Sequence, residues 1–368
     1  MINNCLIKKH VISALSPAVI TANNDLWVWG PNFAGQLGDG THITRYSPIR
    51  VMDNIISVSG NGENIFAIDR ENKLWVFGRD LNNRSNDIRP DHSSPHDITK
   101  PIQIMDDVAA VSANTLYIAV ITTEGSLLIW GYNSYDQLSK GSLFSRNKPV
   151  KIMSNVIDVF AHASGAITAD RTFWGWGPSF SRWFGDGKMI DSKSPIPILK
   201  NVISGDFTMA VTFDNDLWAW GENLWGERGD GNAMMYDIPG YEPILRPKKI
   251  MRNMVSVSKF SEHAMAIDIH GGLWTWGRNR EGQLGDGTNT DRFEAVKIMN
   301  NTVIICAGFY HSMAVTDDGS LWTWGSNYKG QLGIGDSTIK SSNIPIKIMD
   351  NIMLPMHTKT KESSLKIR

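Results

Sequence analysis

The sequence predicts an all-β protein, a seven-bladed β-propeller whose blades are four-stranded antiparallel sheets. Three observations support this prediction. A phrase of the form LWxWG recurs seven times, with its closing glycines 44 to 56 residues apart. Short segments rich in β-branched and aromatic residues flank each copy, which is typical of strands. Glycine and proline bracket these segments, so each repeat holds four short strands, as a propeller blade does.

We call the four strands of each unit A to D. In the last copy they are expected at Val303–Ala307, Ser312–Thr316, Leu321–Gly325 and Ile344–Met349. The units start near residues 11, 56, 109, 156, 202, 255 and 303. We therefore expect one domain over residues 1–355, followed by a basic, disordered tail over residues 356–368.

The tryptophans of the LWxWG phrase alternate with other residues, so both point to one face of the sheet. We expect them to fill the wedge between neighbouring blades, where burial of each contributes about 2–3 kcal/mol. The glycine that follows ends the strand and permits a tight turn. The predicted repeat core comprises Trp27, Trp29, Trp75, Trp130, Trp174, Trp176, Trp218, Trp220, Trp274, Trp276, Trp322, Trp324, Gly30, Gly78, Gly131, Gly177, Gly221, Gly277 and Gly325.

The loop after strand C reads GQLGDG at Gly35–Gly40 and Gly282–Gly287, and GQLGIG at Gly330–Gly335. Together with the tryptophan–glycine strand, this loop resembles the repeat of the regulator of chromosome condensation family, in the form of its bacterial members. The resemblance covers about residues 10 to 351 and implies a seven-bladed propeller. It implies no single function, because members include a nucleotide exchange factor for a nuclear GTPase, a plant UV-B photoreceptor and a secreted bacterial inhibitor of β-lactamase.

The way this ring closes is expected to differ from that of the exchange factor, which joins strands from both termini in one blade. Here the first unit already holds four predicted strands, beginning at Val11, and the last unit also ends with a strand D. We therefore expect the ring to close by packing alone. No residue of the exchange factor is carried over to this sequence.

The connections between strands C and D vary most in length, and the longest are Arg79–Lys100 and Glu222–Arg246. Variable loops on a rigid scaffold commonly carry function, so we expect the face with these loops to bind a partner. The candidate partner-binding residues are Trp183, Trp225, Tyr236, Tyr241, Arg182, Arg84 and Asp91. The alternative is that the loop aromatics cap the core between blades.

The charge, cysteine number and apolar runs of the chain argue against several classes of function. The 368 residues carry a net charge of −1, which argues against nucleic acid as the main partner. Cys5 and Cys306 are the two cysteines, too few for a disulfide framework. No run approaches eighteen apolar residues, so we expect no membrane insertion. A cytoplasmic location follows, with secretion as the alternative if the segment up to Ala22 is a cleaved signal peptide.

No arrangement of side chains indicates catalysis or a metal site. His263 and His311 occupy equivalent positions in units six and seven, but no carboxylate accompanies them, so we expect them to bond local backbone. The segment Asp286–Asp291 has the composition of a turn before that of a calcium loop. We therefore predict a non-enzymatic, monomeric protein-interaction module without a cofactor, whose partner is an unidentified protein. The alternatives are a guanine-nucleotide exchange factor for a small GTPase and a secreted or surface-exposed inhibitor or adhesion propeller.

Overall fold

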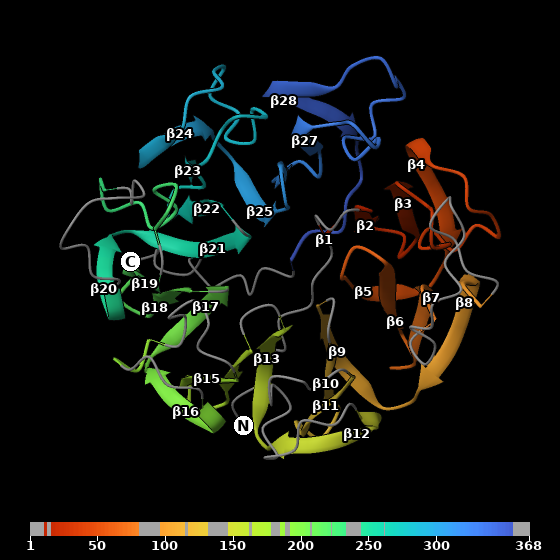
Figure 1. Ribbon diagram of the computed structural model, residues 1–368, viewed down its shortest axis with the longest axis horizontal. Helices are drawn as coiled ribbons and strands as arrows, with labels where there is room; N and C mark the ends of the chain where they lie inside the picture. The colour runs from red at the N-terminus through yellow and green to blue at the C-terminus, as the bar shows by residue number, and fades with distance from the viewer. Residues whose placement is uncertain are drawn as a thin grey trace, which may run out of the picture.

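Seven four-stranded antiparallel sheets stand around a central axis, which confirms the predicted fold class (Figure 1). The computed structural model describes residues 11–12, 16–80, 96–114, 117–131, 146–161, 164–177, 185–187, 192–206, 208–221, 223–232, 244–260 and 262–355. Every sheet consists of four strands that are consecutive in the chain. Strand A of each blade lies nearest the axis and strand D lies at the rim.

Each blade takes its strands in the order A, B, C, D. Blade one holds β1 (Val11–Ile12), β2 (Ala18–Ile20), β3 (Leu26–Gly30) and β4 (Arg45–Met52). Blades two and three hold β5 (Ile55–Gly60), β6 (Asn64–Asp69), β7 (Leu74–Gly78), β8 (Ile98–Met105), β9 (Val108–Ala113), β10 (Tyr117–Thr122), β11 (Leu127–Gly131) and β12 (Arg146–Met153). Blades four and five hold β13 (Val156–Phe160), β14 (Gly165–Thr168), β15 (Phe173–Gly177), β16 (Ser192–Leu199), β17 (Val202–Asp206), β18 (Met209–Thr212), β19 (Leu217–Gly221) and β20 (Ile244–Met251). Blades six and seven hold β21 (Met254–Phe260), β22 (His263–Asp268), β23 (Leu273–Gly277), β24 (Arg292–Met299), β25 (Thr302–Ala307), β26 (His311–Thr316), β27 (Leu321–Ser326) and β28 (Ser341–Met349).

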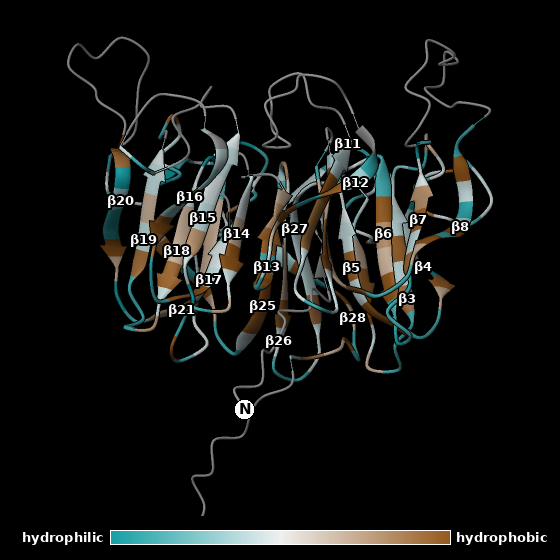
Figure 2. Cartoon of the chain, turned by 90° about the horizontal axis from the view of Figure 1, so that it is seen from below, coloured by the Kyte–Doolittle hydropathy of each residue, from teal (hydrophilic) through white to brown (hydrophobic). Residues whose placement is uncertain are grey.

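The strands run between the two faces of a disc (Figure 2). Because each blade is an antiparallel meander, its A–B and C–D connections share one face, and its B–C turn lies on the other with the passage to the next blade. We call the first the loop face and the second the turn face. The long C–D connections therefore emerge on the same side of the disc as the short A–B loops.

The two tryptophans of the LWxWG phrase have different environments, although we expected both to fill the wedge between blades. The second one is fully buried in five blades, at Trp29, Trp176, Trp220, Trp276 and Trp324. It joins a core shared with the preceding blade, as Trp276 does in the cluster that contains Met209 and Ala219 of blade five. The first one is half-buried and is held from within its own blade, as when the indole N–H of Trp274 donates to Asp268 at 2.8 Å. Only the second tryptophan thus joins neighbouring blades from a fully buried position.

The GQLGDG loop explains why tryptophan, rather than another large apolar residue, recurs at the second position. The indole N–H of Trp276 donates to the backbone oxygen of Glu227 in the loop of blade five, at 2.9 Å. Trp324 makes the same bond to Gln283, and Trp29 to Gln331, both at 2.9 Å. Each loop therefore caps the tryptophan of the next blade. The bond is buried and removes the polar cost of placing an indole N–H in the core.

Two glycines in this arrangement are required for close approach. A Cβ at Gly285 in the loop of blade six would lie 2.7 Å from the indole nitrogen of Trp324. A Cβ at Gly277, which ends strand C, would lie 2.5 Å from the backbone oxygen of Glu262 in the A–B loop. Both glycines also have positive φ, at 75° and 103°. The glycine after the tryptophan therefore admits the neighbouring A–B loop as well as the turn that we expected.

Ring closure differs from our expectation of packing alone, which was wrong. In the six other blades, the first residue of strand A pairs with the end of strand B, as Thr302 does with Thr316. In blade one this place is taken by Ile352, which follows the last strand of blade seven and forms an antiparallel bridge with Thr21. The other end of the same strand is β1, where Val11 pairs with Val19. The innermost strand of blade one is thus assembled from two segments that are far apart in sequence.

Three backbone hydrogen bonds hold the closing segment. The amide of Ala22 donates to the oxygen of Asn351 at 2.8 Å, and the amide of Met353 donates to the oxygen of Ile20 at 2.9 Å. The amide of Ile352 donates to the oxygen of Gly319 at 3.0 Å. The Ile352 side chain is buried in the cluster that contains Trp29. Hydrogen bonds and apolar burial therefore act together at the seam.

We predict that Trp276→Ala lowers the free energy of unfolding by about 3–5 kcal/mol, because it leaves a cavity between two blades and an unpaired carbonyl. Trp225→Ala, in a loop and only half-buried, should cost far less. Chemical denaturation of both variants measures the difference. Equal losses, or a larger loss at Trp225, would contradict the distinction between core and loop tryptophans.

We predict that deleting residues 351–368 lowers the free energy of unfolding by about 4–6 kcal/mol, from the buried Ile352 side chain and three hydrogen bonds of about 1 kcal/mol each. Deleting residues 356–368 is the matched control and should leave the denaturation midpoint nearly unchanged. If both truncations shift the midpoint equally, the seam does not depend on Asn351–Met353.

Candidate functional site

The C–D loops that the structure describes in blades one, five, six and seven are built by local hydrogen bonds and form a fixed surface. In blade six, the Asn279 side chain accepts a hydrogen bond from the amide of Leu284 at 2.9 Å and donates to Asp286 at 3.0 Å. Asp286 also accepts hydrogen bonds from Thr288 at 2.7 Å and from Arg292 at 2.7 Å. Blade one repeats this pattern with Asn32 in place of Asn279. The described parts of these loops are therefore held in place by their own side chains.

On this face, aromatic and arginine side chains from blades five, six and seven form a continuous row. We call it the arginine–aromatic track, and it comprises Phe260, Phe309, Tyr310, Arg278, Trp225 and Arg280. Phe309 and Tyr310 come from the A–B loop of blade seven, and Arg278 and Arg280 follow strand C of blade six. Trp225 comes from the C–D loop of blade five. The track thus extends from the A–B loops near the axis to the C–D loops farther out.

Successive members of the track are in ring contact. The Phe260 and Phe309 rings meet edge to face with centroids 5.1 Å apart, and the Phe309 and Tyr310 centroids are 5.6 Å apart. The Arg278 guanidinium carbon lies 5.8 Å from the centroid of the Tyr310 ring and 4.5 Å from that of Trp225. The corresponding distance from Arg280 to Trp225 is 5.2 Å. Trp225 is therefore in contact with two cations.

The track is positioned by backbone and charge contacts beneath it. The Arg278 side chain pairs with the carboxylate of Glu262, and the Arg278 amide donates to the Glu262 oxygen at 2.9 Å. The amide of Trp225 donates to the Glu227 carboxylate at 2.7 Å. Phe309 and Tyr310 nevertheless remain 43% and 38% exposed, so this row of large side chains is held in place without being covered.

Of the candidate residues that we predicted, Trp225 lies in the track. Trp183, Tyr236, Tyr241, Arg182, Arg84 and Asp91 lie outside the described residues, as does the tail over 356–368. Our sequence analysis missed Phe309, Tyr310 and Arg278. A signal was available, because the A–B loop of unit seven reads GFY where unit two reads NGE. An adjacent aromatic pair in a short loop that is otherwise polar indicates an exposed contact.

His263 and His311 begin strand B in blades six and seven and are buried beside the track. A nitrogen of the His263 ring, Nε2, lies 2.8 Å from the Ser312 hydroxyl, which donates to the Gln283 oxygen at 2.7 Å. Burial lowers the pKa of His263 to about 3, and the charges of His311 and Lys259 add to this effect. Burial alone lowers the pKa of His311 to about 3. Both rings are therefore neutral structural groups at physiological pH.

Local hydrogen bonds hold the Asp286 carboxylate in its turn. Burial alone would raise the pKa of Asp286, but hydrogen bonds from Thr288 and Arg292 outweigh it and hold that pKa below its usual range. This is the behaviour of a turn residue, as we expected for Asp286–Asp291. Among the described residues, no group of three or more His, Cys, Asp or Glu side chains is arranged to hold a metal ion. In the same part of the chain, no helix has the length and apolarity to cross a membrane.

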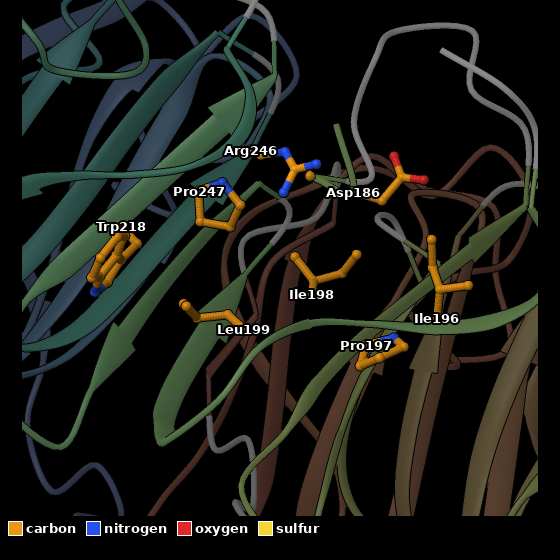
Figure 3. Close-up of a pocket in the computed structure, with 9 residues that line it drawn as sticks. Asp186, Ile196, Pro197, Ile198, Leu199, Trp218, Arg246 and Pro247 are labelled. Carbon is orange, nitrogen blue, oxygen red and sulfur yellow. The ribbon is translucent and has the colours of Figure 1, made fainter. Parts of the chain in front are cut away.

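A separate groove of about 460 Å³ lies between the rims of blades four and five (Figure 3). Its walls are mostly apolar, with Ile198 and Leu199 from β16 facing Trp218 and Pro247 from β19 and β20. Arg246 lies at one end of it. The groove is lined by residues of blades four and five near the rim, and none of the described residues that line it belongs to the track. We therefore treat the track as the candidate site.

We predict that stability falls as the pH is lowered from about 6.5 towards 3, because the unfolded state then protonates two histidines that the folded state keeps neutral. At pH 5 each should cost about 2 kcal/mol, at 1.36 kcal/mol per pH unit below an unfolded pKa of about 6.5. Denaturation of the variant His263→Asn/His311→Asn at pH 7 and pH 5 tests this, since blade two carries Asn64 at this position. If the variant loses as much stability between pH 7 and pH 5 as the unaltered chain does, the assignment is wrong.

Comparison with known proteins identifies the type of repeat. Models of the regulator of chromosome condensation (RCC1) repeat match residues 303–331, and residues 270–315 and 318–354. The Ultraviolet-B receptor UVR8 of Arabidopsis thaliana is 26% identical over 313 residues, which cover 78% of this chain and 67% of that protein. The E3 ubiquitin-protein ligase HERC2 of Homo sapiens is 24% identical over 297 residues, 73% of this chain but only 6% of HERC2.

A solved structure shows the same fold. The crystal structure of Prp20p from Saccharomyces cerevisiae, which was studied with its binding to Gsp1p and histones, superposes with a TM-score of 0.73. The match covers 94% of this chain and 87% of Prp20p at 18% identity. At that identity the likeness shows the fold alone. The chain thus carries RCC1 repeats in a seven-bladed propeller, and relatives with this repeat have different functions.

Proposed function

We propose that this propeller of RCC1 repeats is a non-enzymatic module that binds a protein partner through its loop face, with the arginine–aromatic track at the centre of the contact. The observation that carries the proposal is the uninterrupted row from Phe260 through Tyr310 and Arg278 to Arg280. A surface whose large apolar side chains have no structural need to be exposed is typical of an interaction site.

The residue types in the track are those that contribute most to protein interfaces. Tryptophan, tyrosine and arginine are enriched among the side chains whose truncation costs the most binding free energy. Trp225 and Tyr310 supply broad apolar faces, and Arg280 is exposed and stacks on one of them. Within the described residues no carboxylate pairs with Arg280. A partner that presents apolar groups next to a carboxylate would match this surface.

The rigidity of the track supports binding rather than core capping. Arg278 is held by Glu262, and Trp225 is in contact with two guanidinium groups. Side chains that are already ordered lose little conformational entropy when a partner arrives. Our alternative interpretation, that the loop aromatics cap the core between blades, concerned Trp225 among the described residues, and Trp225 is half-buried. The exposure of Phe309 and Tyr310, which continue the row, supports binding.

The family comparison is consistent with a binding role but does not assign the partner. Prp20p was studied with Gsp1p and histones, and HERC2 is named as a ubiquitin ligase, of which this chain matches 6% of the length. These relatives share the repeat and differ in what they act on. The partner therefore has to be identified by binding experiments on this chain.

We predict that Tyr310→Ala and Arg280→Ala each weaken binding of the partner at least roughly tenfold, since truncation of a hot-spot side chain costs about 2 kcal/mol or more. The experiment is capture of partners from the native cell by the full chain, followed by titration of the purified partner against each variant.

Phe213→Ala is the matched control for these variants. Phe213 is 58% exposed and also lies near an arginine, with the Arg171 guanidinium carbon 5.9 Å from its ring centroid. It follows β18 in a B–C turn, so it lies on the turn face. Binding should survive Phe213→Ala. If the control variant loses binding and the track variants keep it, the working face is the opposite one and the proposal is wrong.

A further inference from the structure

Strand D of every blade is an edge strand at the rim, and all but one carry proline at the same place. Aligned on the residue that pairs with the centre of strand C, the preceding residue is proline in six blades. These are Pro48, Pro101, Pro149, Pro195, Pro247 and Pro345. In blade six it is Ala295. Proline on an edge strand prevents another strand from pairing there, because it has no amide hydrogen and a bulky ring.

The register of β24 indicates that the amide of Ala295 is not needed for pairing with β23. In β24, Val296 pairs with Thr275 and Lys297 with Trp274, which is the register of the proline-containing strands. Since those strands reach the same register without an amide at this position, pairing with β23 does not use the Ala295 N–H. That N–H is therefore a donor on the outer edge of blade six, where the six sister strands have none.

Among the described residues, the backbone of Ala295–Met299 makes no hydrogen bond to another blade. Before it, the oxygen of Phe293 already accepts a hydrogen bond from the amide of Gly231 in the loop of blade five, at 3.1 Å. Within it, Lys297 is exposed. Its side chain and the Asp268 carboxylate both lie beside Gly272 of the same blade, so the lysine that would otherwise guard the edge lies near a carboxylate.

We propose that β24 pairs antiparallel with β24 of a second copy of this chain, about a two-fold axis at Val296. An antiparallel edge is complementary to itself, and this axis places Ala295 opposite Lys297 of the other copy, twice by symmetry. Ala295 and Lys297 are two residues apart in the strand, so their backbone N–H and C=O groups point to the same edge. This is the outer edge that such a pair requires. Glu294 then faces Ile298, and no two like charges lie opposite each other.

This choice of axis follows from charge and size. An axis at Lys297 would place two ammonium groups directly opposite each other, which is unfavourable. With the axis at Val296, the aliphatic stem of Lys297 covers the small Ala295 side chain, and two valines meet at the centre. The pairing uses the rim, so the track on the loop face stays free for a protein partner.

Sedimentation velocity of the full chain over a range of concentrations tests this pairing. The chain should show a monomer–dimer equilibrium, and Ala295→Pro should weaken self-association at least roughly tenfold, because two symmetric hydrogen bonds are lost and the ring clashes. The variant should fold normally, since six sister strands contain proline at this position, and an unchanged denaturation midpoint verifies it. Ala295→Ser, which keeps the amide, is the matched control and should still dimerise.

Three outcomes overturn the proposal. The chain could remain monomeric up to its solubility limit. A dimer could form equally well with Ala295→Pro, which would place the contact elsewhere. Finally, a monomeric chain whose binding to a purified partner is reduced by Ala295→Pro would assign the edge to an extended segment of that partner instead of a second copy.

Discussion

The hydrogen bond from a buried indole to the loop of the preceding blade is the contact on which the rest of this structure depends. Neighbouring blades are joined by single backbone hydrogen bonds, such as that from Met254 to Asn215, and not by a continuous ladder, because each sheet ends at strand A and strand D. Trp276 links blades five and six in two ways. Its ring fills the wedge between them, and its indole N–H donates to the backbone oxygen of Glu227 in blade five. The same pair of roles at Trp324 and Trp29 extends the link around the ring. The repeated phrase therefore encodes an interface between blades more than it encodes a blade.

Because that interface also fixes the C–D loops, stability and function are linked on the loop face. The loop that supplies Trp225 to the track also supplies the Glu227 oxygen to Trp276. A substitution in this loop would thus affect both the surface that a partner contacts and the seam beneath it. Binding residues on such a loop are well positioned, but few neighbouring residues can be substituted without loss of stability.

The fold could be predicted from the sequence because the repeat is written seven times and each copy carries its own strand and turn signals. The different roles of the two tryptophans could not, since alternation places both on one face and only packing decides which reaches the next blade. The seam was missed because a three-residue segment after the last strand, around Ile352, has no pattern of its own. The track was missed in part because it is assembled from loops of three blades, so that Arg278 and Tyr310 become neighbours only through the fold.

The composite strand of blade one has a consequence for how the chain folds as it is synthesised. Each of blades two to seven is complete once its own residues have left the ribosome. Blade one emerges first yet keeps an open place beside Thr21 until Ile352 has been made. During nearly the whole of translation the growing protein is therefore an unclosed arc with unpaired backbone at its leading end. A chaperone that shields that end, or a pause late in translation, would act at the step where the arc becomes a circle.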